Sequence, residues 1–481
     1  MLQNDNVKVV SCTFGQLVTS YNFPIPEINI TGQLHIPEYQ RPYVWKEKQI
    51  NGLLKDLVEY SKDESEDKPL YYLGSIILHQ HGDKLKIIDG QQRITTLLLL
   101  NKFKNPLFKS GIIHSASESI SNIKYNLSYL KSVFEGEVFE FIEDKGALMK
   151  SLDLNKINVT LVVTNSEDLA YTFFETQNTG GVRLSGSDIL KAHHLRAIKN
   201  VKIVNHHARK WEMIDSKEVE YVVQNLTKIR FWDNRKWKQF PFYRDERGIK
   251  DVLIDEYTLK TNKDEKDVSY HYSAIKREGE QISQLQESQY KQIKQPLSDG
   301  NNTLDYINDY IVLYQLLFKN TKVDYRIDDR FYDFRDSVLH GKNGTLFLRE
   351  LMEVAVISYV SRFGFYKLYD ATLWLYRMIY SLRVSMNRNV REDSVFKFVY
   401  DLQFIDNIVE VYTPEELFEF LKRFRYIFDI NNTKENQSKD KHVSTLQNYF
   451  EGLQSISVYR NNPKSFDNNL VELISNKIAQ C

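Results

Sequence analysis

Residues 84–100 read KLKIIDGQQRITTLLLL, and this stretch decides how the N-terminal part of the chain folds. The apolar run that ends at Ile88 is short and is typical of a β-strand. After Asp89 and Gly90 the apolar residues continue from Ile94 to Leu100 with no further turn signal, which predicts a largely buried helix. The sequence IDGQQR therefore lies where a strand ends and a helix begins.

The segments around this junction predict a mixed α and β structure. Residues 71–78 are rich in β-forming residues, and a turn at 81–83 joins them to the strand at 85–88 as a hairpin. Residues 33–37 contain a proline and predict an edge strand. Residues 46–60 have apolar residues on one helical face. Residues 155–164 alternate well enough to predict a further strand.

Beyond about residue 200 the strand signals end and helix signals prevail. Helices are predicted at 305–318, 346–363, 366–386, 395–404 and 413–428, the last with Thr413 as N-cap and Pro414 at its first position. We therefore expect an α+β protein with a mixed N-terminal domain at residues 1–200 and a mainly α-helical domain at residues 201–481. A length of 481 residues is sufficient for two or three domains.

Composition excludes several classes of protein. The chain has 64 basic and 64 acidic side chains, so it is not a uniformly basic protein that coats nucleic acid. Its two cysteines, Cys12 and Cys481, provide neither a disulfide framework nor a zinc motif. We see no secretory signal and no uncharged run of about 18 residues to span a membrane, and so we expect a cytoplasmic protein.

The IDGQQR motif carries groups that suit a phosphate ligand. Gly90 lets the backbone come close to a ligand, and the free N–H groups at a helix start attract anions. Arg93 supplies a forked cation, Gln91 and Gln92 can position a water, and Asp89 can hold a divalent metal or accept a proton. The alternative is a tight turn whose arginine pairs with a nearby carboxylate.

A second cluster, IPEYQRPYVW at residues 36–45, places an arginine between aromatic side chains and two prolines. This composition suits stacking on a planar ligand or binding of phosphate. Packing of an N-terminal strand on the core is the alternative. We expect Gln40 and Arg41 to be mainly functional, and Tyr43 and Trp45 to be mainly structural.

A third cluster is FFETQNTGGVRLSGSDILK at residues 173–191. Gly180 and Gly181 taken alone predict a helix C-cap and a loop. Ser185 and Asp188 match a capping box at the start of the helix that follows.

In this order and spacing, the three clusters together with YYLGSIIL at residues 71–78 resemble the N-terminal domain of GmrSD-type modification-dependent restriction proteins, which has a ParB/sulfiredoxin-like core. The resemblance covers about residues 30–195. It implies a nucleotide-binding and nucleotide-hydrolysing domain in a system that senses or cleaves foreign DNA.

The resemblance also implies site residues. Asp89, Gly90, Gln91, Gln92 and Arg93 match the family's DGQQR motif, which lies where ParB-like proteins bind nucleotide phosphates. The upstream motif and the later loop-and-helix motif are matched by Gln40, Arg41, Asn178, Gly181, Leu184, Asp188 and Lys191. The expected cofactors are a nucleoside triphosphate and Mg²⁺, with Asp89 on the metal. Sulfiredoxin-like thiol chemistry is excluded, because no cysteine lies near the motif.

The sequence departs from full-length GmrSD-type enzymes in lacking a recognisable nuclease of the histidine-metal class. Beyond residue 300 the only histidines are His340 and His442, and neither has a metal-nuclease context. Adjacent histidines at 193–194 and 206–207 point about 100° apart on a helix and are not natural chelates. We therefore expect any DNA cleavage to come from a separate partner nuclease.

One segment has the composition of a nucleic-acid contact. Residues 201–250 contain twelve basic and seven acidic side chains. Cations can contact phosphate and aromatic rings can stack on bases. The candidate contacts are Lys228, Arg230, Arg235, Lys236 and Lys238. The alternative is an amphipathic segment with Phe231, Trp232 and Trp237 in the core.

The preferred interpretation is a nucleotide-dependent sensor or regulatory subunit of an anti-phage, restriction-like system, with DNA as a direct or indirect partner. Its first alternative is a non-enzymatic DNA-binding or scaffolding subunit. The least favoured is a self-sufficient nuclease with an unrecognised active site. The sequence leaves the nucleotide, the DNA modification and the oligomeric state open.

Overall fold

The computed structural model describes residues 7–19, 30, 32–62, 65, 68–108, 111–114, 116–135, 152–167, 169–170, 173, 185–232, 240–263, 266–319, 324–340 and 346–479. The chain divides into two compact units. The first comprises Met1–Leu184 and Lys199–Ile214, and the second comprises Ser185–Ile198 and Asp215–Cys481. The expected domain boundary at residue 200 stays a prediction.

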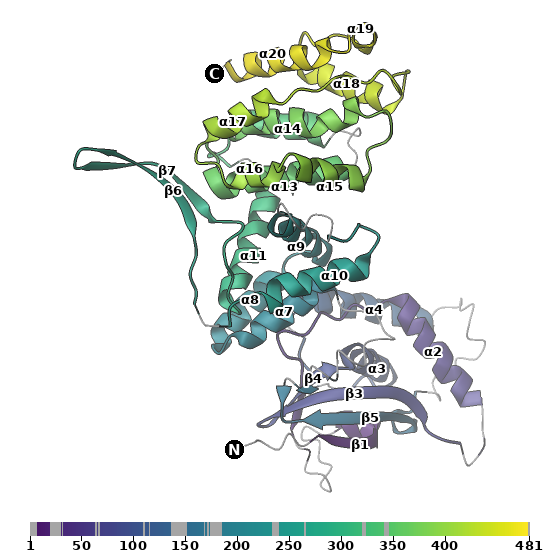
Figure 1. The fold of residues 1–481 in the computed structure, drawn as a ribbon. Coiled ribbons are helices and arrows are strands. Elements are labelled where there is room, and N and C mark those ends of the chain that lie inside the picture. Colours follow the sequence, from purple (N-terminus) through teal and green to yellow (C-terminus); the bar gives the residue numbers. More distant parts are fainter. Residues whose placement is uncertain are drawn as a thin grey trace. The chain divides into compact units, whose positions relative to one another are not determined.

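The first unit contains a mixed five-stranded sheet with the order β1-β5-β3-β4-β2 (Figure 1). The β3–β4 hairpin is antiparallel, and β3 also pairs in parallel with β5. The strands are β1 Lys8–Thr13, β2 Gln33–His35, β3 Tyr71–His81, β4 Lys84–Asp89 and β5 Ile157–Thr164. The hairpin and the edge position of β2 are confirmed. β1, which is partly exposed at the other edge, is an addition to the predicted strands.

The helices of this unit share a hydrophobic core with the sheet. The apolar side chains of the sheet form one core with those of α2, α3 and α4. Within α3 every residue from Ile94 to Leu100 is buried, which confirms the predicted buried helix. The helices are α1 Phe14–Thr19, α2 Glu47–Lys62, α3 Gln91–Lys104, α4 Ser117–Glu135, the 3-10 turn Leu154–Lys156 and α8 Val201–Glu212.

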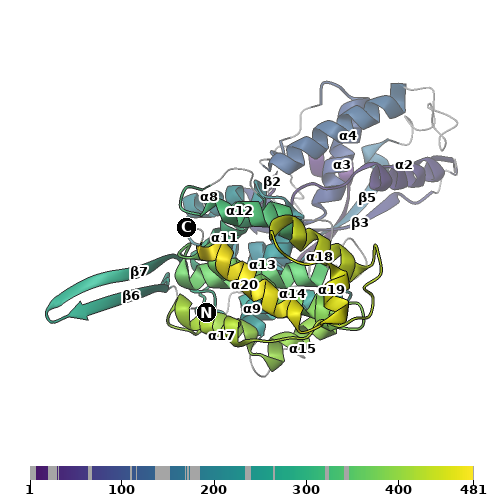
Figure 2. The same ribbon diagram turned by 90° about the horizontal axis from the view of Figure 1, so that it is seen from above.

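The second unit is mainly helical, as predicted (Figures 1 and 2). Its central helices α13 and α14 pack against each other and are buried along most of their length. The α-helices are α7 Gly186–Ala197, α9 Ser216–Phe231, α10 Glu246–Ile254, α11 Asn301–Tyr314, α12 Asp329–Phe334, α13 Leu346–Phe363, α14 Leu368–Ser385, α15 Glu392–Asp401, α16 Phe404–Val409, α17 Pro414–Arg423, α18 Ser438–Tyr449, α19 Ile456–Asn461 and α20 Ser465–Ala479. Three of them continue into π-helical turns at Asp255–Leu259, Gln315–Lys319 and Arg335–Leu339.

The start of α17 agrees with the sequence, but its end does not. The Thr413 side chain accepts a hydrogen bond from the Glu416 N–H at 3.2 Å, as expected for an N-cap. The helix ends at Arg423 and not near Phe428. The chain beyond it is extended, and the Phe428 N–H bonds the Pro463 carbonyl instead of a helical partner.

The second unit also contains a hairpin that the sequence analysis missed. It consists of β6 His271–Glu278 and β7 Gln281–Lys291 and extends away from the helices of its unit (Figures 1 and 2). Its strands are rich in glutamine, serine and charged residues, so no apolar strand signal marks them. None of the helices in the described ranges combines the length and apolar character needed to cross a bilayer.

Candidate nucleotide-binding site

The junction between β4 and α3 has the backbone geometry of an anion site. Gly90 has a φ of 95°, a conformation that favours glycine, and a Cβ placed there would lie 2.9 Å from Ile76 Cγ1. Gly90 is the N-cap of α3, and no side chain caps this end of the helix. The first-turn N–H groups, which have no acceptor within the helix, can therefore bind an anion.

Asp89 and Arg93 lie side by side at this helix start. Arg93 Nη2 is 2.9 Å from Asp89 Oδ2, and the two side chains are 23% and 25% exposed. Two charged groups of opposite sign thus meet beside the anion site, within reach of solvent. The sequence analysis left two interpretations open, a phosphate site and a turn whose arginine pairs with a carboxylate. The arginine–carboxylate pair is present, and it is compatible with a phosphate site.

Gly74 in β3 makes room for the Arg93 guanidinium. A Cβ at this glycine would lie 2.4 Å from Arg93 Nη1, and its φ is 118°. The pairing of β3 with β5 shifts its register between Tyr72 and Gly74. The sequence analysis did not select Gly74, although a glycine inside a strand is a signal for close backbone approach.

The two glutamines of the motif have different surroundings. Gln92 donates to the Pro42 carbonyl at 3.0 Å and accepts from the N–H groups of Val44 and Trp45 at 2.9 and 3.2 Å. These bonds engage both ends of its amide. Gln91 is 4% exposed, and its Oε1 has no hydrogen-bond partner in the described part of the chain. Of the two, Gln91 is the better candidate to meet a water or ligand.

Gln40 brings the second predicted cluster to the same strand end. Its Nε2 donates to the carbonyls of Ile87 and Ile88 at 3.0 and 2.8 Å, next to Asp89. Its Oε1 accepts from the Arg41 N–H at 3.1 Å. The structure therefore places Gln40 of the QR element beside the DGQQR element.

Glu167 is a further polar residue of this unit that the sequence analysis did not select. Its Oε1 accepts a hydrogen bond from Tyr39 and lies 3.8 Å from Lys86 Nζ and 3.9 Å from His79 Nδ1. Burial lowers the pKa of His79, although Glu167 opposes that shift. The loop that carries Gln40 is thus fixed at Tyr39 as well.

The third predicted cluster is only partly described. Asn178, Gly181 and Leu184 lie outside the described residues. Asp188 and Lys191 belong to α7 of the second unit. Ser185 Oγ accepts from the Asp188 N–H at 3.1 Å and the Asp188 carboxylate accepts from the Ser185 N–H at 3.3 Å, which confirms the capping box. Lys191 is only 1% exposed.

The assignment of Lys228 and Arg230 to nucleic-acid contacts is corrected by their burial. Lys228 is 5% exposed and pairs with Glu350. Arg230 Nε lies 2.9 Å from Glu256 Oε1. Both cations are paired with carboxylates inside the helical unit, and this pairing argues against a contact with DNA phosphates. Phe231 and Trp232 are also buried, as the core interpretation expected, while Arg235, Lys236, Trp237 and Lys238 lie outside the described residues.

Among the described residues, one group of side chains is close enough together to share a metal ion. It consists of His193, His194 and Asp299. His193 Nε2 lies 3.1 Å from Asp299 Oδ1. However, His194 Nδ1 accepts a hydrogen bond from the Gly300 N–H at 3.1 Å, and Thr261 donates to Asp299 Oδ1. These bonds occupy His194 Nδ1 and Asp299 Oδ1, so the cluster forms a hydrogen-bond network at the start of α11.

The two C-terminal histidines do not form a nuclease centre in the described residues. His340 Nδ1 lies 3.5 Å from Asp336 Oδ1 on the same helical stretch. His442 stacks on Tyr376 and Tyr380, and its burial lowers its pKa to about 3. Burial also raises the pKa of the Cys12 thiol to about 11, which makes that thiol unreactive near neutral pH.

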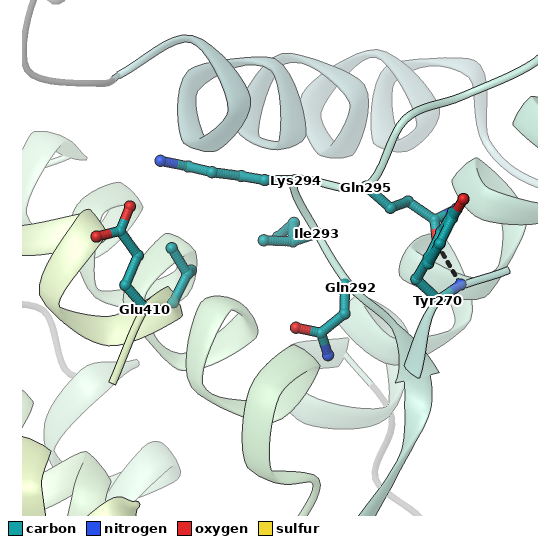
Figure 3. A pocket seen from close by; sticks show the side chains of 7 residues that line it. Tyr270, Gln292, Ile293, Lys294, Gln295 and Glu410 are labelled. Carbon is teal, nitrogen blue, oxygen red and sulfur yellow. Dashed lines mark hydrogen bonds between the residues drawn. The ribbon is translucent and has the colours of Figure 1, made fainter. Parts of the chain in front are cut away.

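A pocket of about 260 Å³ lies at the base of the β6–β7 hairpin. Figure 3 shows Lys294 and Glu410 on one side of it and Tyr270 with Gln295 on the other. Lys294 Nζ is 2.5 Å from Asp406 Oδ1, and the Tyr270 N–H bonds Gln295 Oε1 at 2.9 Å. The lining mixes polar side chains with Ile293 and Val409, and its Lys294 is already paired with Asp406.

A carboxyl group is buried between α9 and α13. Glu353 is 5% exposed, and its Oε2 accepts from the Tyr221 hydroxyl at 2.6 Å. Burial raises the pKa of Glu353 to about 7, and the Tyr221 hydrogen bond and Arg349 only partly oppose this shift. The folded protein therefore holds a proton on Glu353 over a pH range in which the unfolded chain has lost it.

This difference predicts a pH-dependent effect of Glu353→Gln on stability. Between pH 4.5 and about 7 the folded state retains the proton and the unfolded state does not, so wild-type stability falls as pH rises. The neutral variant avoids this loss. We expect the variant to gain up to about 3 kcal/mol over wild type between pH 4.5 and pH 8, since each pKa unit is worth about 1.4 kcal/mol. Urea unfolding at several pH values measures this, and a difference that is constant with pH would contradict it.

Two family models match parts of the chain. Residues 26–195 match the family model described as GmrSD restriction endonuclease, N-terminal domain. This match confirms the resemblance of the sequence motifs to that domain family. Residues 203–438 match a family of unknown function (DUF7834). No curated protein shows significant similarity to the chain.

Proposed function

We propose that the first unit binds and hydrolyses a nucleoside triphosphate and that the chain is a nucleotide-dependent regulatory subunit of a restriction-like defence system. One observation carries this proposal. The uncapped start of α3 lies beside the adjacent Asp89 and Arg93 side chains, where a helix terminus, a cation and a carboxylate can act on one phosphate group. A ParB-like core is part of the same proposal.

Each group then has a defined role. The α3 N–H groups and Arg93 hold the phosphates and stabilise the negative charge that builds up as water bonds the terminal phosphorus and the bond to the departing nucleoside diphosphate breaks. Gln91 orients the attacking water. Mg²⁺ commonly binds one or two carboxylates together with phosphate oxygens and waters, and Asp89 fits this requirement because it is partly exposed and uses Oδ2 for Arg93. When bound, the ion would neutralise phosphate charge.

The match of residues 26–195 to a domain whose description names a restriction endonuclease supports the proposed restriction-like system. His194, His340 and His442 take part in a hydrogen bond, an ion pair and an aromatic stack respectively. We therefore propose that foreign or modified DNA is the signal and that a separate nuclease cuts it. Hydrolysis would change how the chain engages that partner.

A second candidate function has specific support. The Asp89–Arg93 pair satisfies both charges, and the Gln92 amide is fully used to hold residues 42–45. These contacts favour a structural motif in a non-enzymatic scaffolding or DNA-binding subunit. This candidate predicts that the motif stabilises the fold without binding nucleotide.

Binding of β,γ-imido analogues of the four ribonucleoside triphosphates with Mg²⁺ distinguishes the two candidates. We expect wild type to bind at least one analogue in equilibrium dialysis, and Gly74→Ala to bind it at least about tenfold more weakly, because the new Cβ displaces the Arg93 guanidinium. Gly52→Ala is the matched control, since nothing lies within 4 Å of that Cβ. Arg93→Gln, which leaves Gly74 unchanged, should show the same loss. Absence of analogue binding by wild type would favour the scaffold.

A further inference from the structure

Helix α8 carries a row of cations on one side, which we call its cationic face. Residues 199–211 contain four basic side chains and no acidic one, and the acidic residue of the helix, Glu212, is at its C-terminal end. Arg209 and Lys210 follow Lys202 by seven and eight positions, which places the three side chains on the same side of a helix. Lys202 and Arg209 are exposed, and Lys210 is partly exposed. Because the whole chain has equal numbers of basic and acidic side chains, this surplus is local.

The other side of α8 is turned into the protein. His207 is 4% exposed and Ala208 is 3% exposed, and Val204 and Trp211 are half-buried. A helix that lies on a membrane surface needs its apolar side free to enter the lipid. In α8 that side is used for packing, so the cationic face fits a polar, anionic partner better than a lipid surface.

Interactions within the helix explain only part of this charge pattern. Arg209 and Lys210 lie in the last turn, where the helix dipole favours cations. Lys202 lies in the first turn, where the dipole disfavours a cation. Lys202 has no ion-pair partner among the described residues, whereas the buried Lys228 is paired with Glu350. An external anion would therefore supply a negative charge that the surroundings of Lys202 lack.

We propose that the cationic face of α8 binds the phosphate backbone of a DNA duplex. This inference rests on the part of the proposed function that makes DNA the signal. Lys202 and Lys210 are eight residues apart, or about 12 Å along the helix, and a duplex carries about seven phosphate charges over that length. Phosphate contacts position a protein on DNA without reading its sequence. The cationic face therefore holds DNA whether or not the DNA is modified.

The salt dependence of binding to an unmodified, fluorescein-labelled DNA duplex tests this assignment. Fluorescence anisotropy gives the affinity at several NaCl concentrations. We expect wild type to bind in low salt, and a variant with Lys202→Gln, Arg209→Gln and Lys210→Gln to bind at least about tenfold more weakly. Its slope of log affinity against log salt should be shallower by about 2.7, since each lost phosphate contact removes about 0.9.

The matched control combines Lys48→Gln, Lys124→Gln and Lys131→Gln. It removes the same amount of charge from exposed positions of the same unit, and it should keep the wild-type slope. Exchanging lysine for arginine and arginine for lysine at the three positions of the cationic face retains the charge and should also keep the slope. Far-UV circular dichroism and the urea midpoint check that each variant is folded.

Three results would overturn the proposal. They are a wild type that does not bind the duplex in low salt, a cationic-face variant with the affinity and slope of wild type, and a control variant that loses as much as the cationic-face variant. A cationic-face variant that binds the duplex normally but no longer binds phosphatidylserine vesicles would assign the surface to a membrane instead.

Phosphate release measured without DNA separates this inference from the proposed function. A wild type that releases phosphate and binds DNA independently of the cationic face would contradict only the role of α8. A wild type that binds DNA through this face but releases no phosphate from any nucleotide would contradict only the proposed hydrolysis.

Discussion

Replacing Arg93 with alanine is expected to reduce phosphate release from the preferred nucleoside triphosphate by at least about 100-fold, because its guanidinium lies beside both Asp89 and the start of α3. Asp89→Asn should cause a loss of similar size, since it removes the carboxylate assigned to Mg²⁺. A malachite green assay at saturating nucleotide measures both rates.

The fold should survive these substitutions. The Asp89–Arg93 pair is partly exposed, and such pairs contribute at most about 1 kcal/mol to stability. Far-UV circular dichroism and the urea midpoint provide this check. Lys62→Ala is a suitable control, because Lys62 pairs with Glu59 on an exposed face of α2 in the same unit. Turnover at the wild-type rate in both Arg93→Ala and Asp89→Asn would contradict the catalytic assignment.

Arg230→Ala is expected to lower the free energy of unfolding by about 3–5 kcal/mol, which is the usual cost of removing one partner from a buried ion pair. Arg230 bonds Glu256 at 2.9 Å and also donates to the carbonyls of Ile293 and Gln295 at 2.9 and 2.8 Å. Without the guanidinium, the buried Gln295 carbonyl loses its side-chain donor, Glu256 keeps only the more exposed Lys260 as an ion-pair partner, and the Ile293 carbonyl keeps only the Tyr306 hydroxyl. Urea unfolding followed by circular dichroism measures the change.

The matched control is Arg326→Ala in the same unit. Arg326 pairs with Asp324, two residues away, and the arginine side chain is 36% exposed, so its removal should cost about 1 kcal/mol or less. The folded Arg230→Ala variant should retain any affinity for DNA that wild type has. A stability cost below about 1 kcal/mol together with lost DNA binding would contradict this prediction. Arg230 would then be a nucleic-acid contact, as the basic composition of its segment first suggested.

The predictable parts of the fold are those whose burial leaves a pattern in the sequence. The β3–β4 hairpin, α3 and the central helix at 346–363 have apolar runs that match their buried surroundings, and all three were predicted. The β6–β7 hairpin could not be predicted in this way, because its strands are largely exposed and polar. The early end of α17 depends on a bond from Phe428 to Pro463, far away in the sequence.

The candidate site likewise has features that the sequence predicted and features that it could not predict. The sequence motif predicted the strand–helix junction and the cation–carboxylate combination, since glycine, charge and order are local properties. The motif could not show that Gln91 and Gln92 have different surroundings. The Gln92 side chain bonds the backbone of residues 42–45, which are distant in the sequence. Lys228 and Arg230 looked like surface cations because their partners, Glu350 and Glu256, come from distant helical segments.

The most direct test of the central claim is phosphate release by purified wild type from each of the four ribonucleoside triphosphates with Mg²⁺, with and without modified and unmodified DNA. Nucleotide hydrolysis at the α3 terminus predicts release from at least one nucleotide, with a rate that changes when the relevant DNA is present. No release under any of these conditions would contradict the claim and leave the scaffolding function in its place.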